Sequence, residues 1–590
     1  MCGIVGFIGK EQASPVVLRA LTKLEYRGYD SAGVASISDS RILLKKDVGK
    51  IAEVQGKYAL DGLPGTIAIG HVRWATHGKV TVANAHPHMD CDGKIAVVHN
   101  GIIENYQELR HQLEGDHKFV SDTDTEIVCH LIETYMRMGN SLEQAVIAAI
   151  QQLVGSYALA VISVDEPNKI VAVRKSSPLV IGIGDGEYFV ASDALSFLDK
   201  TNQVIFMEDD EVAVIAGDGV DIYNKKGKHV NRKPTKIEWE WDQASKNGHD
   251  YFMLKEIIEG PGAIQNAATQ DKKHVMDVAM TILRAEQVVI TACGSSRYAA
   301  LIGRYLFSQL AGKFCDVVMA SEFQYFASSI DKHTVVIAVS QSGETADVME
   351  GVKMARDKGA KIISIVNVPG SSLARIAHKA LYLNCGPEIC VAATKSFIAQ
   401  LVIFYLLSFA MMNKLDQGTK QLKGLSVGVN GSFDENSQKL MVLADKLHEQ
   451  GNFYYIARGI NFAMASEGAL KLKELSYIHA EGMPAGELKH GTIALIEEGT
   501  PVVAICPNDE TYHETVSNAI ETKARGAFII GVSDRDNEVY DAWIKVPEVE
   551  DIFYPLSVVL PLQLLAYYLA VRLGKDPDKP RNLAKSVTVK

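Results

Sequence analysis

The sequence lacks the signals of an extracellular, membrane or nucleic-acid-binding protein. Its eight cysteines are scattered through 590 residues without a C-x-x-C pair, a pattern typical of reduced thiols rather than of a disulfide framework. No basic segment leads into an apolar one at the start of the chain, so no secretory signal is evident. Together these absences predict a cytoplasmic protein.

Long apolar runs and excess positive charge are also absent. The longest apolar stretch, Phe397 to Met412, is too short to span a bilayer comfortably and is interrupted by Gln400. We interpret it as a buried helix and expect no membrane association. The formal net charge of -11 and the pI near 5.9 argue against a nucleic-acid partner, which would need clustered basic residues. Small-molecule chemistry is therefore the default hypothesis.

Familiar metal motifs are missing as well. There is no H-E-x-x-H, and the histidines of His86-Pro87-His88 and His99 lack acidic or cysteine partners at ligand spacing. We therefore expect no metal in the function of this protein.

The first residues carry unusual chemistry. Cys2 is followed by an apolar, glycine-containing run from Gly3 to Gly9. If the initiator methionine is removed, Cys2 has both a thiol and a free α-amino group, and such an amine titrates at about 7.7 to 8.0. The amine can then exchange a proton with the thiol or with a leaving ammonia. A lone cysteine at this position is usually an ordinary terminal residue, so a catalytic role for Cys2 needs support from the rest of the chain.

Composition divides the chain into two halves. Residues 2–216 contain many short β-like runs, such as Ile95-Ala96-Val97-Val98, and a helical stretch near Asp124 to Met138, which predicts a sheet-rich α+β domain. Residues 217–261 are largely polar and aromatic, as in Trp239-Glu240-Trp241-Asp242, and are predicted to link two domains.

The remaining half contains an internal repeat. Apolar runs that begin at Val288 and Thr334, and the segment Ala355–Ala360 before an Ile-rich strand, have counterparts at nearly equal offsets of 165, 166 and 167 residues. Continuous apolar strands that alternate with helices indicate parallel sheets covered by helices. We therefore expect two duplicated α/β lobes, residues 276–415 and 446–580, followed by a tail at 581–590. Ligands of such sheets bind beyond the carboxyl ends of the strands.

Two loops of the first lobe have the composition of a phosphate site. Cys293-Gly294-Ser295-Ser296 follows one predicted strand, and Ser340-Gln341-Ser342-Gly343-Glu344-Thr345 follows another. Each offers hydroxyl groups and backbone N–H groups at a helix N-terminus, although either could be a simple helix cap. Neither has the lysine of a nucleotide-binding P-loop. Two such loops on one sheet favour a phosphomonoester, for example a sugar phosphate.

The second lobe and the tail contain further candidates. Lys471 and Glu474 are three residues apart on a predicted helix and share a face; they form either a surface ion pair or part of a site. Lys585 lies in a tail that is apolar enough to pack against the protein, so it is either a solvated lysine or a site residue.

Over its whole length the chain resembles the glucosamine-6-phosphate synthases, the isomerising glutamine:fructose-6-phosphate aminotransferases. The matching segments are ordered and spread over all three predicted lobes. They are Cys2-Gly3-Ile4-Val5-Gly6, residues 24–33, Arg73-Trp74-Ala75-Thr76-His77-Gly78, residues 99–105, residues 340–345, Leu470-Lys471-Leu472-Lys473-Glu474 and residues 582–589.

This resemblance implies an N-terminal-nucleophile glutaminase domain followed by two lobes of the sugar isomerase (SIS) type. Cys2 is expected to attack the side-chain amide of glutamine and release ammonia through a thioester. Asn100 and the Gly101 N–H match the oxyanion hole. The matched glutamine-binding residues are Arg73, Trp74, Thr76, His77 and Asp124; Trp74 also matches the gate of an ammonia channel.

The resemblance also implies roles in the isomerase half. Contacts to the sugar phosphate are expected from Ser295, Ser296, Ser340, Gln341, Ser342, Thr345 and Val391. Glu474 matches the proton-transfer base, Lys471 its support, His490 the residue that assists ring opening, and Lys585 the amine that forms an imine with the ketose. His490 comes from the neighbouring subunit in the family, so a homodimer is expected. The family implies no metal or organic cofactor.

Two positions depart from the family pattern and keep alternatives open. Ala393 stands where the family has a serine, which removes one hydroxyl from the sugar site, and Ser295 replaces a threonine. One alternative is a related amidotransferase that aminates another phosphosugar. The other is a non-catalytic sensor of sugar phosphates, which would be expected to lack the acid and base residues.

Overall fold

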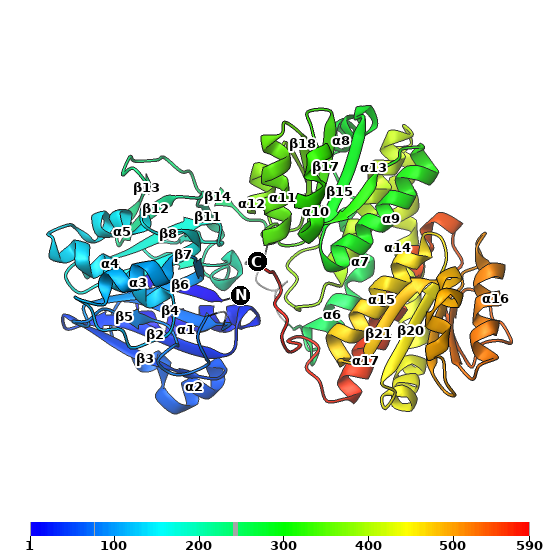
Figure 1. The fold of residues 1–590 in the computed structure, drawn as a ribbon, viewed down its shortest axis with the longest axis horizontal. Helices are drawn as coiled ribbons and strands as arrows, with labels where there is room; N and C mark the ends of the chain where they lie inside the picture. Colours follow the sequence, from blue (N-terminus) through cyan, green and yellow to red (C-terminus); the bar gives the residue numbers. More distant parts are fainter. Residues whose placement is uncertain (1, 76, 240–245, 589–590) are drawn as a thin grey trace. The chain divides into compact units, whose positions relative to one another are not determined.

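The computed structural model describes residues 2–75, 77–239 and 246–588, and its elements are labelled in Figure 1. The chain forms two compact units. Unit 1 comprises Met1–Ala244 together with Ala584–Lys590, and unit 2 comprises Ser245–Leu583. Each unit is described by itself.

Unit 1 contains two largely antiparallel sheets. The eight-stranded sheet has the order β14-β11-β9-β10-β1-β4-β2-β3, and the six-stranded sheet has the order β13-β12-β8-β7-β6-β5. The strands of the first sheet are β1 (Gly3–Ile8), β2 (Ser31–Ser38), β3 (Arg41–Val48), β4 (Ile67–Arg73), β9 (Val180–Ile183), β10 (Tyr188–Ala191), β11 (Gln203–Phe206) and β14 (Thr235–Lys236). Those of the second are β5 (His88–Met89), β6 (Ile95–Ile103), β7 (Gly155–Ser163), β8 (Lys169–Lys175), β12 (Glu211–Ala216) and β13 (Gly219–Asn224).

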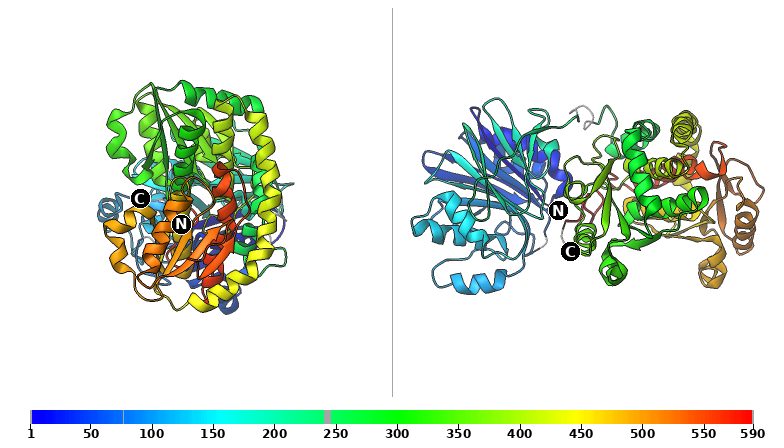
Figure 2. Two further views of the ribbon diagram at one scale, coloured as in Figure 1. Left: turned by 90° about the vertical axis from the view of Figure 1, so that its right-hand side faces the viewer. Right: turned by 90° about the horizontal axis from the view of Figure 1, so that it is seen from above.

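The two sheets stack face to face, as the right-hand view of Figure 2 shows. Alternate apolar residues of both sheets, such as Ile69 and Ala160, form the core between them, because successive side chains of a strand point to opposite faces. Helix α1 (Ala13–Leu24) packs on the outer face of the first sheet. Helices α4 (Thr125–Arg137) and α5 (Leu142–Ile150) bury the outer face of the second sheet, and α3 (Tyr106–Leu113) packs on α4. Shorter helical segments of unit 1 are α2 (Ile51–Tyr58) and the 3-10 turns Glu25–Arg27, Leu60–Gly62 and Ala194–Ser196.

Unit 2 contains two parallel five-stranded sheets with the same topology. Their orders are β16-β15-β17-β18-β19 and β21-β20-β22-β23-β24. The first consists of β15 (Gln287–Ala292), β16 (Asp316–Met319), β17 (Thr334–Ser340), β18 (Lys361–Val366) and β19 (Lys379–Tyr382). The second consists of β20 (Asn452–Ala457), β21 (His479–Pro484), β22 (Pro501–Ile505), β23 (Phe528–Ser533) and β24 (Ala542–Lys545). The predicted duplication and the predicted fold class are confirmed.

Helices connect these parallel strands, as a parallel pairing requires. In the first lobe they are α9 (Gly294–Ala311), α10 (Ala320–Phe326), α11 (Ala346–Asp357) and α12 (Ser372–Ile376), and in the second α15 (Asn461–Ser476) and α16 (Tyr512–Lys523). The other helices of unit 2 are α6 (Phe252–Ile258), α7 (Gly260–Ala267), α8 (Lys272–Arg284), α13 (Lys395–Met411), α14 (Leu415–Leu447) and α17 (Tyr554–Arg572). One apolar core joins the two lobes through α9, α13, α15 and α17.

The most apolar helices of unit 2 lie in this core. Every residue of α13 is buried, so the interpretation of the run near Phe397 as a buried helix is confirmed. The segment Asp551–Arg572 is long and apolar enough to cross a membrane, but 89% of its most apolar window is buried inside the fold. A buried core helix has the same length and apolar composition, so these two properties are only weak support for a membrane span.

The segment expected to link the domains, residues 217–261, contains regular structure. β13 pairs with β12 and β14 pairs with β11, both in unit 1. Residues 240–245 lie outside the described part of the chain. α6 and the start of α7 belong to unit 2.

Candidate active site

The thiol of Cys2 lies against the end of β4 in unit 1. The backbone N–H of Trp74 donates a hydrogen bond to Cys2 Sγ at 3.2 Å, and Sγ lies 3.3 Å from the carbonyl oxygen of Trp74. Burial raises the pKa of the Cys2 thiol, while the Trp74 N–H acts in the opposite direction. The protonated thiol is therefore favoured at rest, and attack on a substrate requires a base to remove its proton.

A glycine makes this close approach possible. A Cβ atom at Gly28 would lie 2.6 Å from the carbonyl carbon of Arg73 and 2.7 Å from the backbone nitrogen of Trp74. Only glycine fits there without a shift of the backbone. The sequence Arg27-Gly28-Tyr29 thus allows the turn at Trp74, whose indole contacts the Tyr29 ring edge-on at 5.5 Å.

An open cavity of ≈ 260 Å³ lies over the thiol. It is lined by Cys2, Arg73, Trp74, His77, His86, His99, Gly101, Thr123, Asp124 and Thr125. The guanidinium of Arg73 donates to the carbonyl oxygens of His77, Gly78 and Lys79. Asp124 accepts a 2.8 Å hydrogen bond from the backbone N–H of Ile103. The cavity therefore offers one fixed cation and one fixed carboxylate to a bound molecule.

The predicted oxyanion donors lie on β6. Gly101 lines the cavity and has φ +124°, and a Cβ there would lie 1.9 Å from the carbonyl oxygen of Ser156, so the position requires glycine. The amide Nδ2 of Asn100 donates to the carbonyl oxygen of Cys2 at 3.1 Å and to Ser192 Oγ at 2.8 Å. Asn100 thus holds the backbone of Cys2 in this structure.

Buried histidines support Asn100. His71 Nε2 donates to Asn100 Oδ1 at 3.0 Å, and the His71 ring stacks on His86 at 4.1 Å. Burial lowers the pKa of His71 to about 3 and the pKa of His86 well below its ordinary value, so both rings are neutral. Sequence reasoning missed His71 and Ser192, because neither lies in a motif with an evident chemical role. Thr76, which the sequence assigns to the glutamine site, lies outside the described residues.

A charged face of α15 forms the centre of a second candidate site in unit 2. Glu467, Lys471 and Glu474 follow one another at helical spacing, so their side chains share one face. Lys471 Nζ lies 2.5 Å from Glu474 Oε2 and 3.6 Å from Glu467 Oε1. The Lys471 side chain is buried, whereas that of Glu474 is 21% exposed. Burial lowers the pKa of Lys471, but the two carboxylates outweigh it and raise the pKa, so Lys471 is charged.

Glu467 joins this face to the first lobe. Ser295 Oγ, at the start of α9, donates to Glu467 Oε1 at 2.9 Å. Burial raises the pKa of Glu467 to about 7, although Lys471 acts to lower it. The sequence analysis found Lys471 and Glu474 but missed Glu467, which the i, i+4, i+7 spacing could have revealed.

The loop after β17 is an ordered turn rich in hydroxyl groups. Ser340 Oγ lies 2.9 Å from Thr345 Oγ1 and accepts a 3.0 Å hydrogen bond from the Gly343 N–H. The Glu344 N–H donates to Ser342 Oγ at 3.2 Å. Thr345 is the N-cap residue of α11 but makes no side-chain capping bond. Backbone donors at such a helix N-terminus are suited to a phosphate.

Other predicted sugar-site residues lie around the same lobe. Ser296 Oγ accepts a 3.0 Å hydrogen bond from Gln400 Nε2. The backbone of Gln341 accepts from the Asn367 N–H at 2.9 Å, and the Val391 N–H donates to the carbonyl oxygen of Asp578 at 3.2 Å. Ala393, the position that lacks the family's hydroxyl, is half-buried.

His490 and Lys585, which were also predicted as site residues, do not belong to the groups described above. His490 is exposed at the end of the short 3-10 segment Ala485–His490, which follows β21. Lys585 is half-buried and belongs to the segment Ala584–Lys590, which groups with unit 1. The site roles of both residues stay predictions.

Comparison with known proteins gives similarity over the whole chain. A family model described as SIS domain matches residues 281–410 and 446–573, and one described as Glutamine amidotransferase domain matches residues 71–200. The glutamine–fructose-6-phosphate aminotransferase (isomerizing) of Pyrococcus horikoshii is 46% identical over 598 residues, with 100% of both chains covered. That of Thermococcus kodakarensis is 47% identical over 601 residues, again with 100% of both chains covered.

Among solved structures, the C-terminal domain of glucosamine-fructose-6-phosphate aminotransferase from Francisella tularensis is similar to this chain. It is 32% identical with a TM-score of 0.53, and the match covers 57% of this chain and 100% of that one. Tagatose-6-phosphate ketose/aldose isomerase from Escherichia coli, 16% identical with a TM-score of 0.51, shares the fold of this region.

Proposed function

The chain belongs to the family of isomerizing glutamine–fructose-6-phosphate aminotransferases, and on this premise we propose how its residues divide the reaction. The enzyme transfers the amide nitrogen of glutamine to fructose 6-phosphate and isomerises the product to glucosamine 6-phosphate, with glutamate released. Glutamine chemistry takes place at the Cys2 cavity, and amination and isomerisation take place at the two SIS lobes with Lys585 of the tail. The observation that carries this division is the Cys2 thiol at a cavity with one fixed cation and one fixed carboxylate.

Cys2 is the nucleophile of the glutaminase half. Its sulfur attacks the amide carbon of glutamine while the free α-amino group takes the thiol proton and passes it to the departing ammonia. Water then hydrolyses the thioester to glutamate. The raised pKa of the thiol supports a built-in base, since an unassisted thiol in this site stays protonated.

Charge complementarity orients the glutamine. Arg73 binds the α-carboxylate and Asp124 binds the α-amino group, and both line the cavity that contains the thiol. His77, which also lines this cavity, and Thr76 complete the set of glutamine-binding residues. Trp74 gates the exit of ammonia, and its backbone contacts the reacting sulfur. Gly101 and Asn100 stabilise the oxyanion; loss of one such donor typically costs about 10²- to 10³-fold in rate.

Lobe 1 of unit 2 binds the phosphate of the sugar. The hydroxyl groups of Ser340, Ser342 and Thr345 and the N-terminus of α11 supply donors, and Ser295, Ser296, Gln341 and Val391 complete the sugar contacts. This proposal is supported by the uncapped start of α11 beside the Ser340–Thr345 contact. A phosphate dianion is stabilised there by the helix dipole.

Glu474 transfers the proton between C1 and C2 of the sugar. It is partly exposed, so it can contact substrate, and the buried ammonium of Lys471 lies 2.5 Å away, where it stabilises developing negative charge. Lys585 forms the imine with the open-chain ketose. We propose no cofactor, because each of these steps requires positioned acids, bases and amines alone.

The topology of lobe 2 supports a homodimer in which His490 acts on the partner's sugar. Helix α15 follows β20 and runs from the carboxyl edge of the sheet back toward its amino edge. Glu474 is near the end of α15, just before β21 begins. His490 follows the end of β21. A six-residue strand spans roughly 20 Å, so the two residues of one chain lie near opposite ends of that strand. A second copy can bring His490 to Glu474. We also propose a cytoplasmic location, which agrees with eight free cysteines.

The decisive assay measures glutamate and glucosamine 6-phosphate together after incubation with glutamine and fructose 6-phosphate. Equal formation of both is expected. Glutamate without amino sugar would overturn the assignment and favour an amidotransferase for another phosphosugar, for which the missing hydroxyl at Ala393 is the one supporting observation. No reaction with either substrate would favour a sensor.

A Cys2→Ala variant tests the division of labour. It should lose glutamine-dependent synthesis but retain conversion of fructose 6-phosphate to glucose 6-phosphate in unit 2. Loss of both activities in a folded chain would contradict separate sites. A chain whose N-terminus is extended, so that the α-amino group is blocked, should also lose glutamine hydrolysis, and full activity would contradict the role given to that amine.

A further inference from the structure

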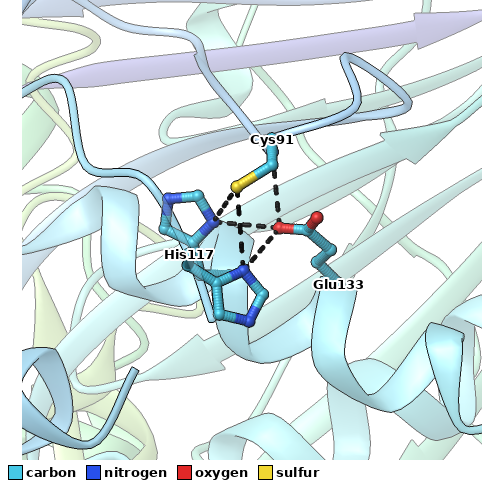
Figure 3. Close-up of side chains that lie close together, drawn as sticks. Cys91, His117 and Glu133 are labelled. Carbon is cyan, nitrogen blue, oxygen red and sulfur yellow. Dashed lines mark hydrogen bonds and ion pairs between the residues drawn. The ribbon is translucent and has the colours of Figure 1, made fainter. Parts of the chain in front are cut away.

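A second cluster of ligand-type side chains lies in unit 1, and the catalytic scheme does not use it. Cys91 follows β5, His117 lies in the loop between α3 and α4, and His130 and Glu133 are three residues apart on α4. Figure 3 shows Cys91, His117 and Glu133 directed toward one another. One ligand atom from each of the four residues lies within 4.8 Å of all the others.

The distances between these atoms approach those of a four-coordinate metal site. Cys91 Sγ lies 3.8 Å from His117 Nδ1 and 3.7 Å from His130 Nδ1. Glu133 Oε2 lies 2.9 Å from His117 Nδ1 and 3.0 Å from His130 Nδ1. Ligands of tetrahedral zinc, with Zn–S near 2.3 Å and Zn–N or Zn–O near 2.0 Å, are separated by about 3.3 to 3.5 Å. These four distances differ from that geometry by about 0.2 to 0.4 Å.

The hydrogen bonds of His117 show which of its nitrogens faces away from the cluster and donates to Thr134. The single hydroxyl proton of Thr134 is donated to the carbonyl oxygen of His130 at 2.8 Å. His117 Nε2 lies 2.8 Å from that same hydroxyl oxygen and must therefore be its donor. His117 Nδ1 therefore faces the Glu133 carboxylate, at 2.9 Å from Oε2. Either a proton or a metal ion between the two atoms accounts for this contact.

His130 is oriented in the same way. Its Nδ1 faces Cys91 and Glu133, while its Nε2 lies 3.8 Å from Glu126 Oε1 and has no hydrogen-bond partner among the described residues. Glu126 is fixed by the N–H groups of Val120 and Ser121 at 2.8 and 2.7 Å. Glu126 is therefore the carboxylate nearest to the outer nitrogen of His130, on the side where metal-binding histidines commonly have one, although the 3.8 Å separation is longer than a hydrogen bond.

Cys91 is the accessible member of the cluster. It is exposed, and its sulfur accepts a 3.4 Å hydrogen bond from the backbone N–H of Lys118. N–H donors of this kind stabilise a metal-bound thiolate. The other oxygen of Glu133, Oε1, pairs with Arg137, while Oε2 faces the cluster and also accepts a 3.3 Å hydrogen bond from the Cys91 N–H. An ion could enter from the side of Cys91 while three buried ligands hold it.

We propose that Cys91, His117, His130 and Glu133 bind one Zn²⁺ ion as a structural site. A thiolate, two imidazoles and a carboxylate form a mixed S/N/O set that suits zinc, and the thiolate and carboxylate balance its two positive charges. Binding releases the thiol proton of Cys91 to solvent. Four protein ligands fill a tetrahedron, so no position is left for substrate and the role is structural rather than catalytic.

The ion would join three segments that no regular pairing holds together. Cys91 is in the turn between β5 and β6, His117 is in the α3–α4 loop, and the other ligands are on α4. That loop continues to Thr123 and Asp124, which line the cavity over Cys2. The proposal itself does not depend on the catalytic assignment, because metal binding is measured without turnover.

Metal content of the purified full-length chain, prepared without a histidine tag, is the first test. We expect about one zinc per chain, and a fall to less than about a tenth of that content in Cys91→Ser and His117→Gln. Cys2→Ser and His111→Gln are the matched controls: one removes another thiol of unit 1 and the other an exposed histidine of α3, and both should retain the wild-type zinc content. Equal zinc in wild type and Cys91→Ser would overturn the proposal.

Cobalt(II) and a chelator test the wild-type chain directly, so the result does not depend on variants that fold. After removal of zinc, one equivalent of cobalt(II) should give the intense absorption of a thiolate–cobalt bond and the visible bands of tetrahedral cobalt. Removal of zinc should lower the unfolding midpoint of unit 1 by roughly 5 °C. Absence of the cobalt–thiolate band would overturn the proposal and leave a protonated histidine pair on Glu133 as the explanation of the cluster.

Discussion

The two lobes of unit 2 place their strands in the same order, yet the loops after matching strands differ in charge. After β17, the first lobe presents Ser340, Ser342 and the N-cap Thr345. After β22, the second lobe presents Asp509 before the N-cap Thr511. Asp509 accepts hydrogen bonds from the Thr511 N–H at 2.8 Å and from Asn461 Nδ2 at 2.9 Å. Asp509 stands where the first lobe has Gly343, while Glu344 and Glu510 match each other, so the second loop carries one more carboxylate than the first.

The helices that follow β15 and β20, α9 and α15, also differ, and here it is the second lobe that carries the polar face. In α15, Glu467, Lys471 and Glu474 form the charged face of the candidate site. At the matching positions of α9, 165 residues earlier, stand Ile302, Leu306 and Gln309; Ile302 and Leu306 are fully buried in the core. In the proposed scheme, phosphate binding belongs to the first lobe and proton transfer to the second.

A Glu474→Gln substitution should have the largest effect on this division. The amide cannot accept the sugar proton, so synthesis of glucosamine 6-phosphate should fall by roughly 10³-fold, while glutamine hydrolysis in unit 1 continues. Coupled measurement of glutamate and amino sugar checks both. Gln309→Ala, the exposed match on α9, is the control and should leave synthesis unchanged. A comparable loss in the control would contradict the asymmetry of the lobes.

A carboxylate placed in the phosphate loop should have the next largest effect. Ser342→Asp puts a negative charge beside the proposed phosphate position, and like charges at such a distance cost several kcal/mol. The KM for fructose 6-phosphate should rise by roughly 10²-fold, with a smaller change in kcat. Asn508→Asp, an exposed residue in the corresponding loop of lobe 2, should leave KM unchanged. An equal rise in both variants would argue against a phosphate site confined to lobe 1.

The lobes also differ in a titratable group, because Glu467 of the second lobe ionises whereas Ile302 at the matching position of the first cannot. The raised pKa of Glu467 therefore predicts a pH dependence of the free energy of unfolding. Burial raises the Glu467 pKa to about 7 from 4.5, so between these values the folded chain holds a proton that the unfolded chain releases. Stability from this group is therefore present below about pH 4.5 and is lost as pH rises to about 7. Glu467→Gln should remove this loss.

The free energy of unfolding of Glu467→Gln, relative to wild type, should therefore increase by roughly 2 kcal/mol between pH 5 and pH 8. Urea unfolding at the two pH values measures it. The exposed residue Glu538 gives the control Glu538→Gln, which should shift the free energy by less than about 0.5 kcal/mol at either pH. A difference from wild type that is independent of pH would show that burial of Glu467 does not control its protonation.

Much of this fold could be predicted from the sequence, because the duplication repeats continuous apolar strands at a nearly constant offset. The phosphate loop and the Lys471–Glu474 pair could also be found, since both are local patterns. Glu467 and Ser295 are 172 residues apart, and Asn100 and Ser192 are 92 apart, so their contacts depend on packing that no local pattern reports. The same holds for Cys91 and His117, which have no metal-motif spacing in the sequence.

The smallest expected difference between the lobes concerns a glycine at the same position of α9 and α15. A Cβ at Gly303 would lie 2.4 Å from Phe404 Cδ1, whereas a Cβ at Gly468 would lie 2.9 Å from Tyr455 Cε1. Alanine gains about 1 kcal/mol in a helix interior, and overpacking of a core costs about 1 to 3 kcal/mol. Gly303→Ala should therefore destabilise unit 2 by about 1 kcal/mol, and Gly468→Ala should be nearly neutral. Urea unfolding midpoints compare the two variants; a larger loss for Gly468→Ala would mean that the second lobe, which contains α15, is the more tightly packed.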